Sequence, residues 1–149
     1  MNQFQFLGFA AFHITCSDGT TILIDPYLDK NPASPLKAAD IKKLDLMLIS
    51  HAAFDHIGEA DVIAKNTGCA VICGGDSKLW LLERGVDPKQ IIETVWGLTV
   101  RGAGIYVRPV ESRHRSATFL KDGRQVTALP LGFMIDLPDG TRVYNASDT

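Results

Sequence analysis

Short apolar runs separated by turn residues open the chain. Polar and apolar residues alternate loosely over residues 3–9, and residues 10–17 form a second run of the same kind. The pair Asp18-Gly19 follows, and a third run covers residues 20–25. An Asp-Gly pair between apolar runs is typical of a tight β-hairpin turn. We therefore predict three consecutive strands that form a meander.

The next segment alternates between short buried runs and longer amphipathic ones. Prolines at 26, 32 and 35 exclude a regular element from residues 26–38, which we expect to form a loop. The pattern then predicts a strand at 46–49, a helix at 57–67, a strand at 69–73, a helix from Asp76 or Ser77 to Arg84, and a strand at 90–95. This alternation indicates a layered α/β arrangement.

From residue 97 onward the helical pattern disappears. The remaining apolar runs are short strand candidates, and they cover residues 98–100, 104–110, 126–129, 133–137 and 142–145. The pairs Asp122-Gly123 and Asp139-Gly140 supply turns between them. The second half of the chain therefore predicts a separate, antiparallel sheet.

A cluster of polar residues follows the central strand at 46–49. His51, Asp55 and His56 stand close together there. Open α/β sheets place their chemistry at the carboxyl ends of strands, and imidazole and carboxylate are the usual ligands of zinc. The same spacing fits surface histidines around a helix with Asp55 as its cap. His51 and Asp55 are also four apart, as a pair on a helix would be, but Gly58 and the preceding strand favour a loop.

Composition narrows the possible partners. The chain has 149 residues, of which 46% are hydrophobic, so it fits one domain, residues 1–149, with a sizeable core. A net charge of −2 argues against nucleic acid as a partner. No run approaches the roughly 18 apolar residues of a membrane span, and no signal peptide is visible. We expect a cytoplasmic protein without a membrane partner.

Several other polar residues have two interpretations. Cys16, Cys69 and Cys73 are expected to be buried thiols in a reducing compartment, with a disulfide or a two-sulfur metal clip as the alternative. Asp25 is either an outer-shell residue that supports metal ligands or a turn carboxylate that caps the following loop. His13 lies in a predicted strand and is expected to be packed or on the surface rather than a ligand.

The histidine cluster and several further motifs resemble a known family. The pattern Ser-His-x-x-x-Asp-His at 50–56 resembles the metal-binding signature of the metallo-β-lactamase superfamily, whose usual form is His-x-His-x-Asp-His. Other stretches resemble one branch, the small metal-dependent hydrolases related to ascorbate-6-phosphate lactonase. They occur in the family's order at residues 7–12, 22–28, 31–32, 57–60 and 145–149. The resemblance implies an α/β fold with four layers, an αββα sandwich.

The chain departs from the family pattern at several positions. Ala53 stands where the family usually has its second histidine, Phe9 where histidine is common, and Ser147 where the family has glycine. Family members also continue past the position of Thr149 and include a last metal-binding histidine. The resemblance therefore implies a sandwich that is incomplete at the C-terminus. Because exposed strand edges invite pairing, we expect the chain to bind a second copy of itself or a separate C-terminal segment.

The resemblance also implies a set of metal ligands. They are His51, Asp55, His56, His114 and Asp148, with Asp148 bridging two ions. Each site keeps three protein ligands, which together with water is a catalytic zinc pattern. We expect a divalent metal, zinc with manganese as the alternative, in one or two copies. Taken alone, His114 is a loop histidine of the kind usually found on the surface, and Asp148 is a solvated residue near a terminus.

The implied chemistry is hydrolysis. A metal-bound hydroxide attacks an ester, lactone, amide or phosphodiester, and Asp55 is the expected catalytic residue, as both ligand and proton acceptor. The sequence does not select among these substrates. Arg108, Arg113 and Arg115 are near His114 in the chain and form either a site for an anionic group of a small-molecule substrate or a solvated strand end.

Two other functions fit the same family. A catalytically silent relative, whose fold serves binding or assembly, is favoured by Ala53 and Phe9. A superfamily nuclease is disfavoured by the net charge and by the lack of basic stretches interleaved with aromatic residues. Metal content separates the first of these alternatives from the enzyme.

Overall fold

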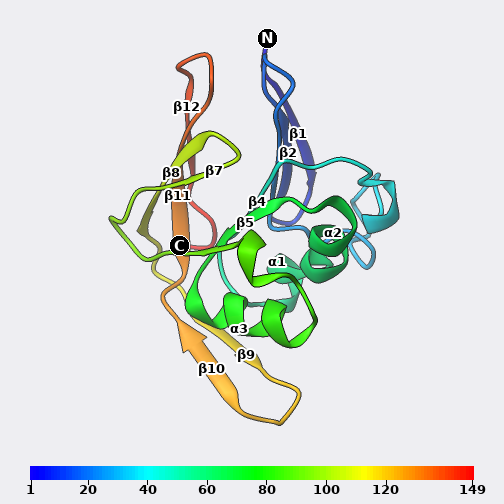
Figure 1. The fold of residues 1–149 in the computed structure, drawn as a ribbon, viewed down its shortest axis with the longest axis vertical. Coiled ribbons are helices and arrows are strands. Elements are labelled where there is room, and N and C mark those ends of the chain that lie inside the picture. Colours follow the sequence, from blue (N-terminus) through cyan, green and yellow to red (C-terminus); the bar gives the residue numbers. More distant parts are fainter.

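The computed structural model describes residues 1–149 and contains two main β-sheets, a separate β-hairpin and three α-helices (Figure 1). The first sheet has six strands that lie in sequence order. They are β1 (Gln3–Gly8), β2 (Ala11–Thr15), β3 (Thr21–Ile24), β4 (Leu46–Ile49), β5 (Ala70–Cys73) and β6 (Ile91–Glu93). The first three strands form the predicted antiparallel meander, whereas β3 to β6 run parallel.

Helices connect β4 to β5 and β5 to β6, as the pattern predicts, whereas a loop with one short 3₁₀ helix connects β3 to β4. The helices are α1 (Phe54–Ile57), α2 (Ala60–Thr67) and α3 (Gly75–Glu83), together with the short 3₁₀ helices η1 (Ala38–Asp40) and η2 (Pro88–Gln90). Parallel neighbours need crossover connections, and here this loop and the helices supply them. All the carboxyl ends of β3, β4 and β5 therefore meet at one edge of the sheet.

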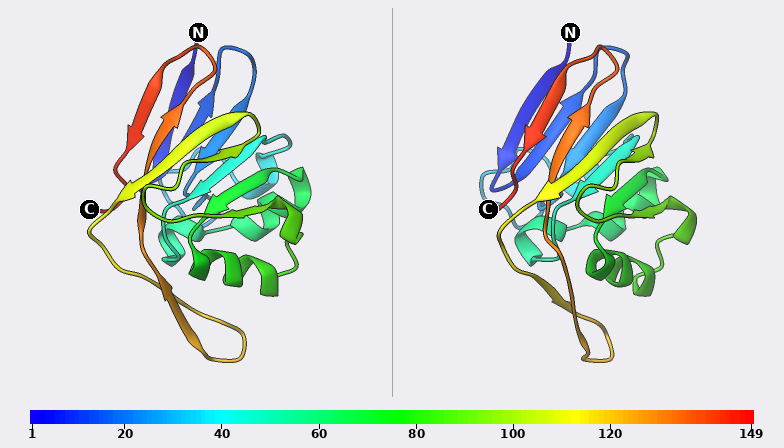
Figure 2. Two further views of the ribbon diagram at one scale, coloured as in Figure 1. Left: turned by 60° about the vertical axis from the view of Figure 1, so that its left-hand side comes forward. Right: turned by 90° about the vertical axis from the view of Figure 1, so that its left-hand side faces the viewer.

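The second sheet is antiparallel, as predicted, with the strand order β12-β11-β8-β7. Its strands are β7 (Val100–Gly102), β8 (Ile105–Glu111), β11 (Leu131–Asp136) and β12 (Arg142–Asn145). Between β8 and β11 the chain forms a hairpin of β9 (Ser116–Phe119) and β10 (Gln125–Ala128), which projects beside α3 (Figures 1 and 2). The apolar pattern does not predict β9, because its four residues, Ser-Ala-Thr-Phe, form no apolar run.

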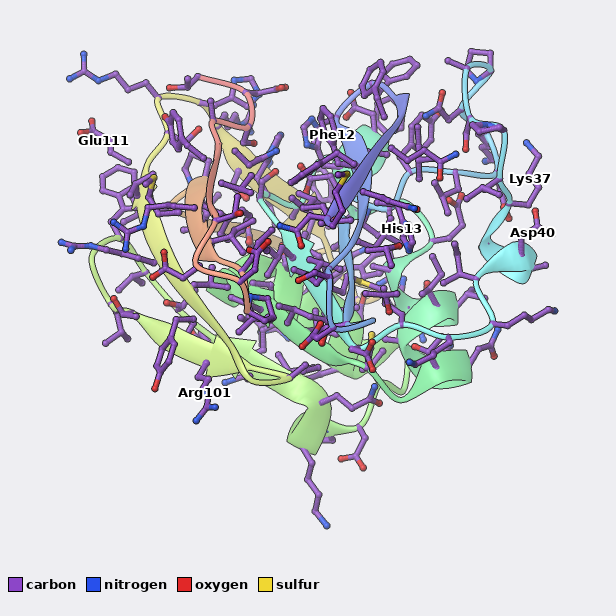
Figure 3. The ribbon with its side chains drawn as sticks, turned by 90° about the horizontal axis from the view of Figure 1, so that it is seen from above. Phe12, His13, Lys37, Asp40, Arg101 and Glu111 are labelled. Atoms are coloured by element: carbon purple, nitrogen blue, oxygen red, sulfur yellow. The ribbon has the colours of Figure 1, made fainter.

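The central strands of the first sheet are buried on both faces, as β4 shows. Leu46 and Leu48 belong to a cluster between the two sheets, whereas Met47 and Ile49 belong to a cluster between the first sheet and the helices. All four side chains are fully buried, which explains why the strand reads as a continuous apolar run. Phe12 packs against the cluster between the sheets, and His13, its neighbour on β2, belongs to the alternate face of the strand (Figure 3).

The layers are helices, first sheet and second sheet, seen from above in Figure 3. The outer face of the second sheet carries no helix among residues 1–149. The structure thus contains three of the four layers of an αββα sandwich. None of the helices has the length and apolar character that crossing a bilayer requires.

Two helix starts differ from the sequence interpretation. Asp55 and His56 lie within the short helix α1, not in a loop, and Ala53 is the N-cap, so Asp55 does not cap it. Helix α3 begins at Gly75 with Gly74 as its N-cap, so neither Asp76 nor Ser77 has that role. The Asp76 carboxylate does not cap α3; it accepts a hydrogen bond from the hydroxyl of Ser116 in β9, which is distant in sequence.

The three cysteines are buried and unpaired. Cys69 and Cys73 lie in the cluster under the helices, on the same face of the sheet, and Cys16 lies between the sheets. Burial raises the pKa of the Cys73 thiol far above its ordinary value and also raises that of Cys69. These thiols are therefore packing residues rather than nucleophiles or ligands.

Candidate metal centre

The polar residues of the site stand where parallel strands end. Asp25 directly follows β3, and Ser50 and His51 directly follow β4. Because β3 and β4 are parallel neighbours, these residues meet at the same edge of the sheet. The sequence placed His51 at a strand end, and pairing of the strands brings Asp25 beside it.

Asp25 organises the buried part of the site. It is fully buried and has a φ of +49°, which is strained for a residue other than glycine. Its Oδ1 atom accepts a hydrogen bond from the backbone N–H of Ser50 at 2.8 Å, and its Oδ2 atom accepts one from the Ser50 hydroxyl at 2.7 Å. Its Oδ2 also lies 2.8 Å from Nδ1 of His56. These contacts fit the outer-shell interpretation of Asp25 and not that of a loop cap.

The contact between Asp25 and His56 fixes the histidine ring. When Nδ1 of His56 carries the ring proton and donates a hydrogen bond to the carboxylate, Nε2 has a free lone pair and can act as the ligand atom. Gly58, which ends α1, makes this approach possible: a Cβ there would lie 2.5 Å from Cα of Tyr27, in the segment that follows Asp25. Only glycine allows α1 to come so close to that segment.

Asp148 brings a second carboxylate to the histidines. Its Oδ2 atom lies 3.2 Å from Nε2 of His56 and 3.8 Å from Nε2 of His114. The ring centroid of His51 lies 3.9 Å from that of His56 and 5.0 Å from that of His114. His51, His56 and Asp148 each offer a ligand atom, and these atoms all lie within 4.8 Å of one another. Segments from three parts of the chain thus converge on one point.

A cation fits this group because one nitrogen atom of the group has no hydrogen-bond partner. Nε2 of His51 is buried and forms no hydrogen bond, whereas Nδ1 of the same ring contacts the Ser50 hydroxyl at 3.0 Å. Leaving a buried polar atom unpaired costs about 1–3 kcal/mol, and a metal ion would satisfy it. Two imidazoles and a carboxylate are a donor set that suits a divalent transition metal.

The two buried histidines differ in their affinity for protons. Burial, assisted by the charge of His56, lowers the pKa of His51, so this ring stays neutral and able to bind a metal. Burial also acts to lower the pKa of His56, but the hydrogen bond that its ring donates to Asp25 and the charges of Asp25 and Asp148 outweigh burial, and the pKa is raised. Opposite shifts in rings less than 4 Å apart are typical of a functional site.

The remaining predicted site residues lie at or beyond the edge of this group. His114 is 44% exposed and borders it. Asp55 is half-buried on α1 and lies outside the group of three, although its charge contributes to the raised pKa of His56.

The predicted arginine patch is dispersed. Arg113 pairs with Glu111, and Arg108 lines a hollow on the outer face of the second sheet that no histidine lines. The three arginines therefore do not form one patch beside His114.

Two residues that support the site were not identified from the sequence. Asn31 is buried, and its side-chain amide donates to the carbonyls of Leu7, Gly8 and Tyr27, which joins the β1–β2 turn to the segment after Asp25. Glu59 accepts hydrogen bonds from the backbone of that same segment. Both residues fall within stretches that carry the family resemblance, at 31–32 and 57–60, and this was the only feature of the sequence that pointed to them.

Paired sheets with a histidine and aspartate group at the strand ends define a metallo-β-lactamase fold. Residues 20–149 match the model of the beta-lactamase superfamily domain, and the chain belongs to this superfamily. A UPF0173 metal-dependent hydrolase of Koribacter versatilis is 37% identical over 149 residues, and one of Rubrobacter xylanophilus is 32% identical over 148 residues. Both comparisons cover 99% of this chain, which spans 62% and 60% of the length of these relatives.

Solved structures show the same fold. Igni18, a metallo hydrolase of Ignicoccus hospitalis, superimposes with a TM-score of 0.76 at 30% identity over 98% of this chain and 60% of its own. CmlA, a diiron β-hydroxylase of Streptomyces venezuelae, superimposes with a TM-score of 0.66 at 20% identity over 98% of this chain and 29% of its own. The second similarity concerns the fold alone.

Proposed function

We propose that the protein is a metal-dependent hydrolase whose metal is held by His51, His56 and Asp148, with His114 at the border. The observation that carries the proposal is the buried, unpartnered Nε2 atom of His51 beside the other two ligand groups. The relatives named metal-dependent hydrolases support it. We propose zinc as the first candidate, because nitrogen and carboxylate ligands in a small group suit it.

The bound metal would supply a Lewis acid that acidifies water and polarises a carbonyl or phosphoryl oxygen. The residues of the chain prepare the site for this. Asp25 orients His56, and the low proton affinity of His51 keeps its ring available near neutral pH. We propose that Asp55, adjacent to His56 on α1, is the proton acceptor.

A hollow beside Asp148 is the proposed place for the substrate. It has a volume of about 310 Å³ and is lined by Phe9, Phe12 and Tyr144 together with Asp148. Phe9 and Tyr144 are each more than half exposed, and Phe9 has a φ of +54°, which is rare for a bulky residue. We infer that the substrate is a small molecule with an apolar group next to the scissile ester, lactone or amide bond.

The edge strand β1 is proposed as a site of self-association. Phe4 and Phe6 on this strand are 52% and 60% exposed. An edge strand with exposed aromatic side chains offers both unpaired backbone groups and apolar area to a second copy. Sedimentation velocity of the chain and of a Phe4→Lys/Phe6→Lys variant would show a dimer only for the former.

The alternative function is a silent member of the superfamily that binds without catalysis. Ala53 supports it, because this position, next to α1, provides no imidazole. The two functions differ in a measurable way. A hydrolase contains stoichiometric metal after purification in zinc-supplemented medium, and a chelator removes its activity toward aryl esters and lactones. A folded protein that has no metal and is inert toward both substrates would establish the silent alternative.

A further inference from the structure

The two loops that carry His51 and His114 are held together by hydrogen bonds close to each histidine. His51 follows β4, whereas His114 lies 63 positions later between β8 and β9. His114 is 44% exposed, so packing alone does not fix its loop. Its neighbours two positions away on either side, Ser112 and Ser116, are both buried.

These serines bind the backbone of two other segments of the site. The Ser116 hydroxyl accepts a hydrogen bond at 3.1 Å from the backbone N–H of Ala52, the residue next to His51. The Ser112 hydroxyl donates one at 2.7 Å to the backbone carbonyl of Asp148. The loop of His114 is thus attached on one side to the His51 segment and on the other side to the Asp148 segment.

Asp76 completes the first of these attachments. It follows β5, the parallel neighbour of β4, so it reaches the same edge of the sheet as His51. It is buried, and its Oδ2 atom accepts a hydrogen bond from the Ser116 hydroxyl, whereas Oδ1 accepts one from the backbone N–H of Ser77 at 2.7 Å. A buried carboxylate is a strong acceptor and costs free energy to bury, so it holds the hydroxyl in one orientation.

We propose that Asp76, Ser116 and Ser112 are positioning residues that set the separation of His51, His114 and Asp148. The proposal rests on the metal site proposed above. The Ser116 hydroxyl has one proton, and it uses this proton to donate a hydrogen bond to Asp76. A lone pair of the Ser116 oxygen is therefore directed at the N–H of Ala52. Loss of either partner frees the loop of His114 and enlarges the space between the ligands.

The experiment compares Ser116→Ala, Asp76→Asn and Ser112→Ala with the unchanged chain. Zinc affinity is measured by competition with a chelating dye, the Co²⁺ absorption spectrum reports ligand geometry, and hydrogen exchange of the Ala52 amide reports the attachment without metal. Ser116→Thr keeps the hydroxyl and is the conservative variant. Matched controls are Asp61→Asn, on the first turn of α2, and Ser34→Ala, whose hydroxyl bonds the carbonyl of Leu36.

We expect Ser116→Ala to weaken zinc binding about 10-fold or more, to alter the Co²⁺ spectrum and to speed exchange at Ala52. Asp76→Asn should act in the same direction, Ser112→Ala should weaken zinc binding without affecting Ala52, and Ser116→Thr should retain near-normal affinity. If Asp76→Asn does not fold, Ser116→Ala decides the question. Unchanged affinity and spectrum in Ser116→Ala, or equal losses in the controls, would overturn the proposal.

The design separates this proposal from the proposed function. A wild-type chain that binds neither zinc nor Co²⁺ overturns the metal-dependent function and the positioning role together. Normal metal binding in the wild type with no effect of the three variants overturns the positioning role alone. Faster Ala52 exchange in Ser116→Ala without loss of metal affinity shows a purely structural attachment and likewise overturns it.

Discussion

Nδ1 of His56 lies 2.8 Å from Oδ2 of Asp25, although the two residues are 31 positions apart in the chain. Asp25 reaches this point because β3 and β4 are parallel neighbours, and His56 because Gly58 lets α1 approach the segment after Asp25. A buried carboxylate is thereby matched with an imidazole whose other nitrogen points toward Asp148. This contact connects the pairing of β3 and β4 to the position of His56 in the candidate metal centre.

Replacement of this carboxylate should weaken metal binding. Asp25→Asn keeps the size of the side chain and tolerates the positive φ, so it removes mainly the charge that orients His56. We expect zinc affinity to fall about 10- to 100-fold, as measured by competition with a chelating dye. Asp61→Asn, a control on α2, should bind as the wild type does. Wild-type affinity in Asp25→Asn would mean that the charge of Asp25 does not prepare His56 for metal binding.

An imidazole at position 53 should strengthen the site. Ala53 is a half-buried N-cap with extended backbone, two residues from His51 and three from His56. We expect Ala53→His to bind zinc on the order of 10-fold more tightly, which corresponds to about 1.4 kcal/mol. Competing titrations of both chains against one dye provide the measurement. Equal affinities would show that the site is complete without this ligand.

The turn between β7 and β8 should be open to stabilisation. Its two residues, Ala103 and Gly104, both have positive φ, at +49° and +83°, which is the geometry of a type I′ turn. Alanine is strained there, whereas Asn-Gly is the preferred pair. Ala103→Asn should raise the free energy of unfolding by about 0.5–1 kcal/mol, seen as a higher midpoint in urea. The control variant Ala39→Asn, in η1, should not raise the free energy of unfolding.

Asp45 should make stability depend on pH in the acidic range. Burial acts to raise its pKa, but hydrogen bonds from the backbone N–H and hydroxyl of Thr21, each 2.8 Å long, outweigh burial and lower it. Because the folded pKa lies below the unfolded value of about 3.9, the stabilisation is complete above that pH and is lost as pH falls through the folded pKa.

Urea unfolding at several pH values tests this. The difference in free energy of unfolding between the wild type and Asp45→Asn should be constant from pH 5 to 7 and should shrink below about pH 4. Asp18→Asn, in the exposed turn before Thr20, serves as the comparison. A difference that grows as pH falls would contradict the assignment.

The strands and most helices could be predicted because their signals are local. The continuous apolar run of β4, for example, depends only on the burial of both faces of the strand. The Asp18-Gly19 turn likewise depends on adjacent residues. Histidine, aspartate and serine in family motifs identified the superfamily and the residues from which the site is built.

The tertiary structure decided which polar residues share the site. Asp76 has no local signal for its role, and the sequence leaves two interpretations of Asp25 open. The order of the parallel strands and the return of β9 bring Asp25, Asp76 and Ser116 to His51 and His56. The same packing placed Asp55 within α1, outside the group of three residues that could hold a metal ion. Hydrophobic burial follows the local pattern, whereas hydrogen bonds between distant side chains exist only after the sheet has brought the strand ends together.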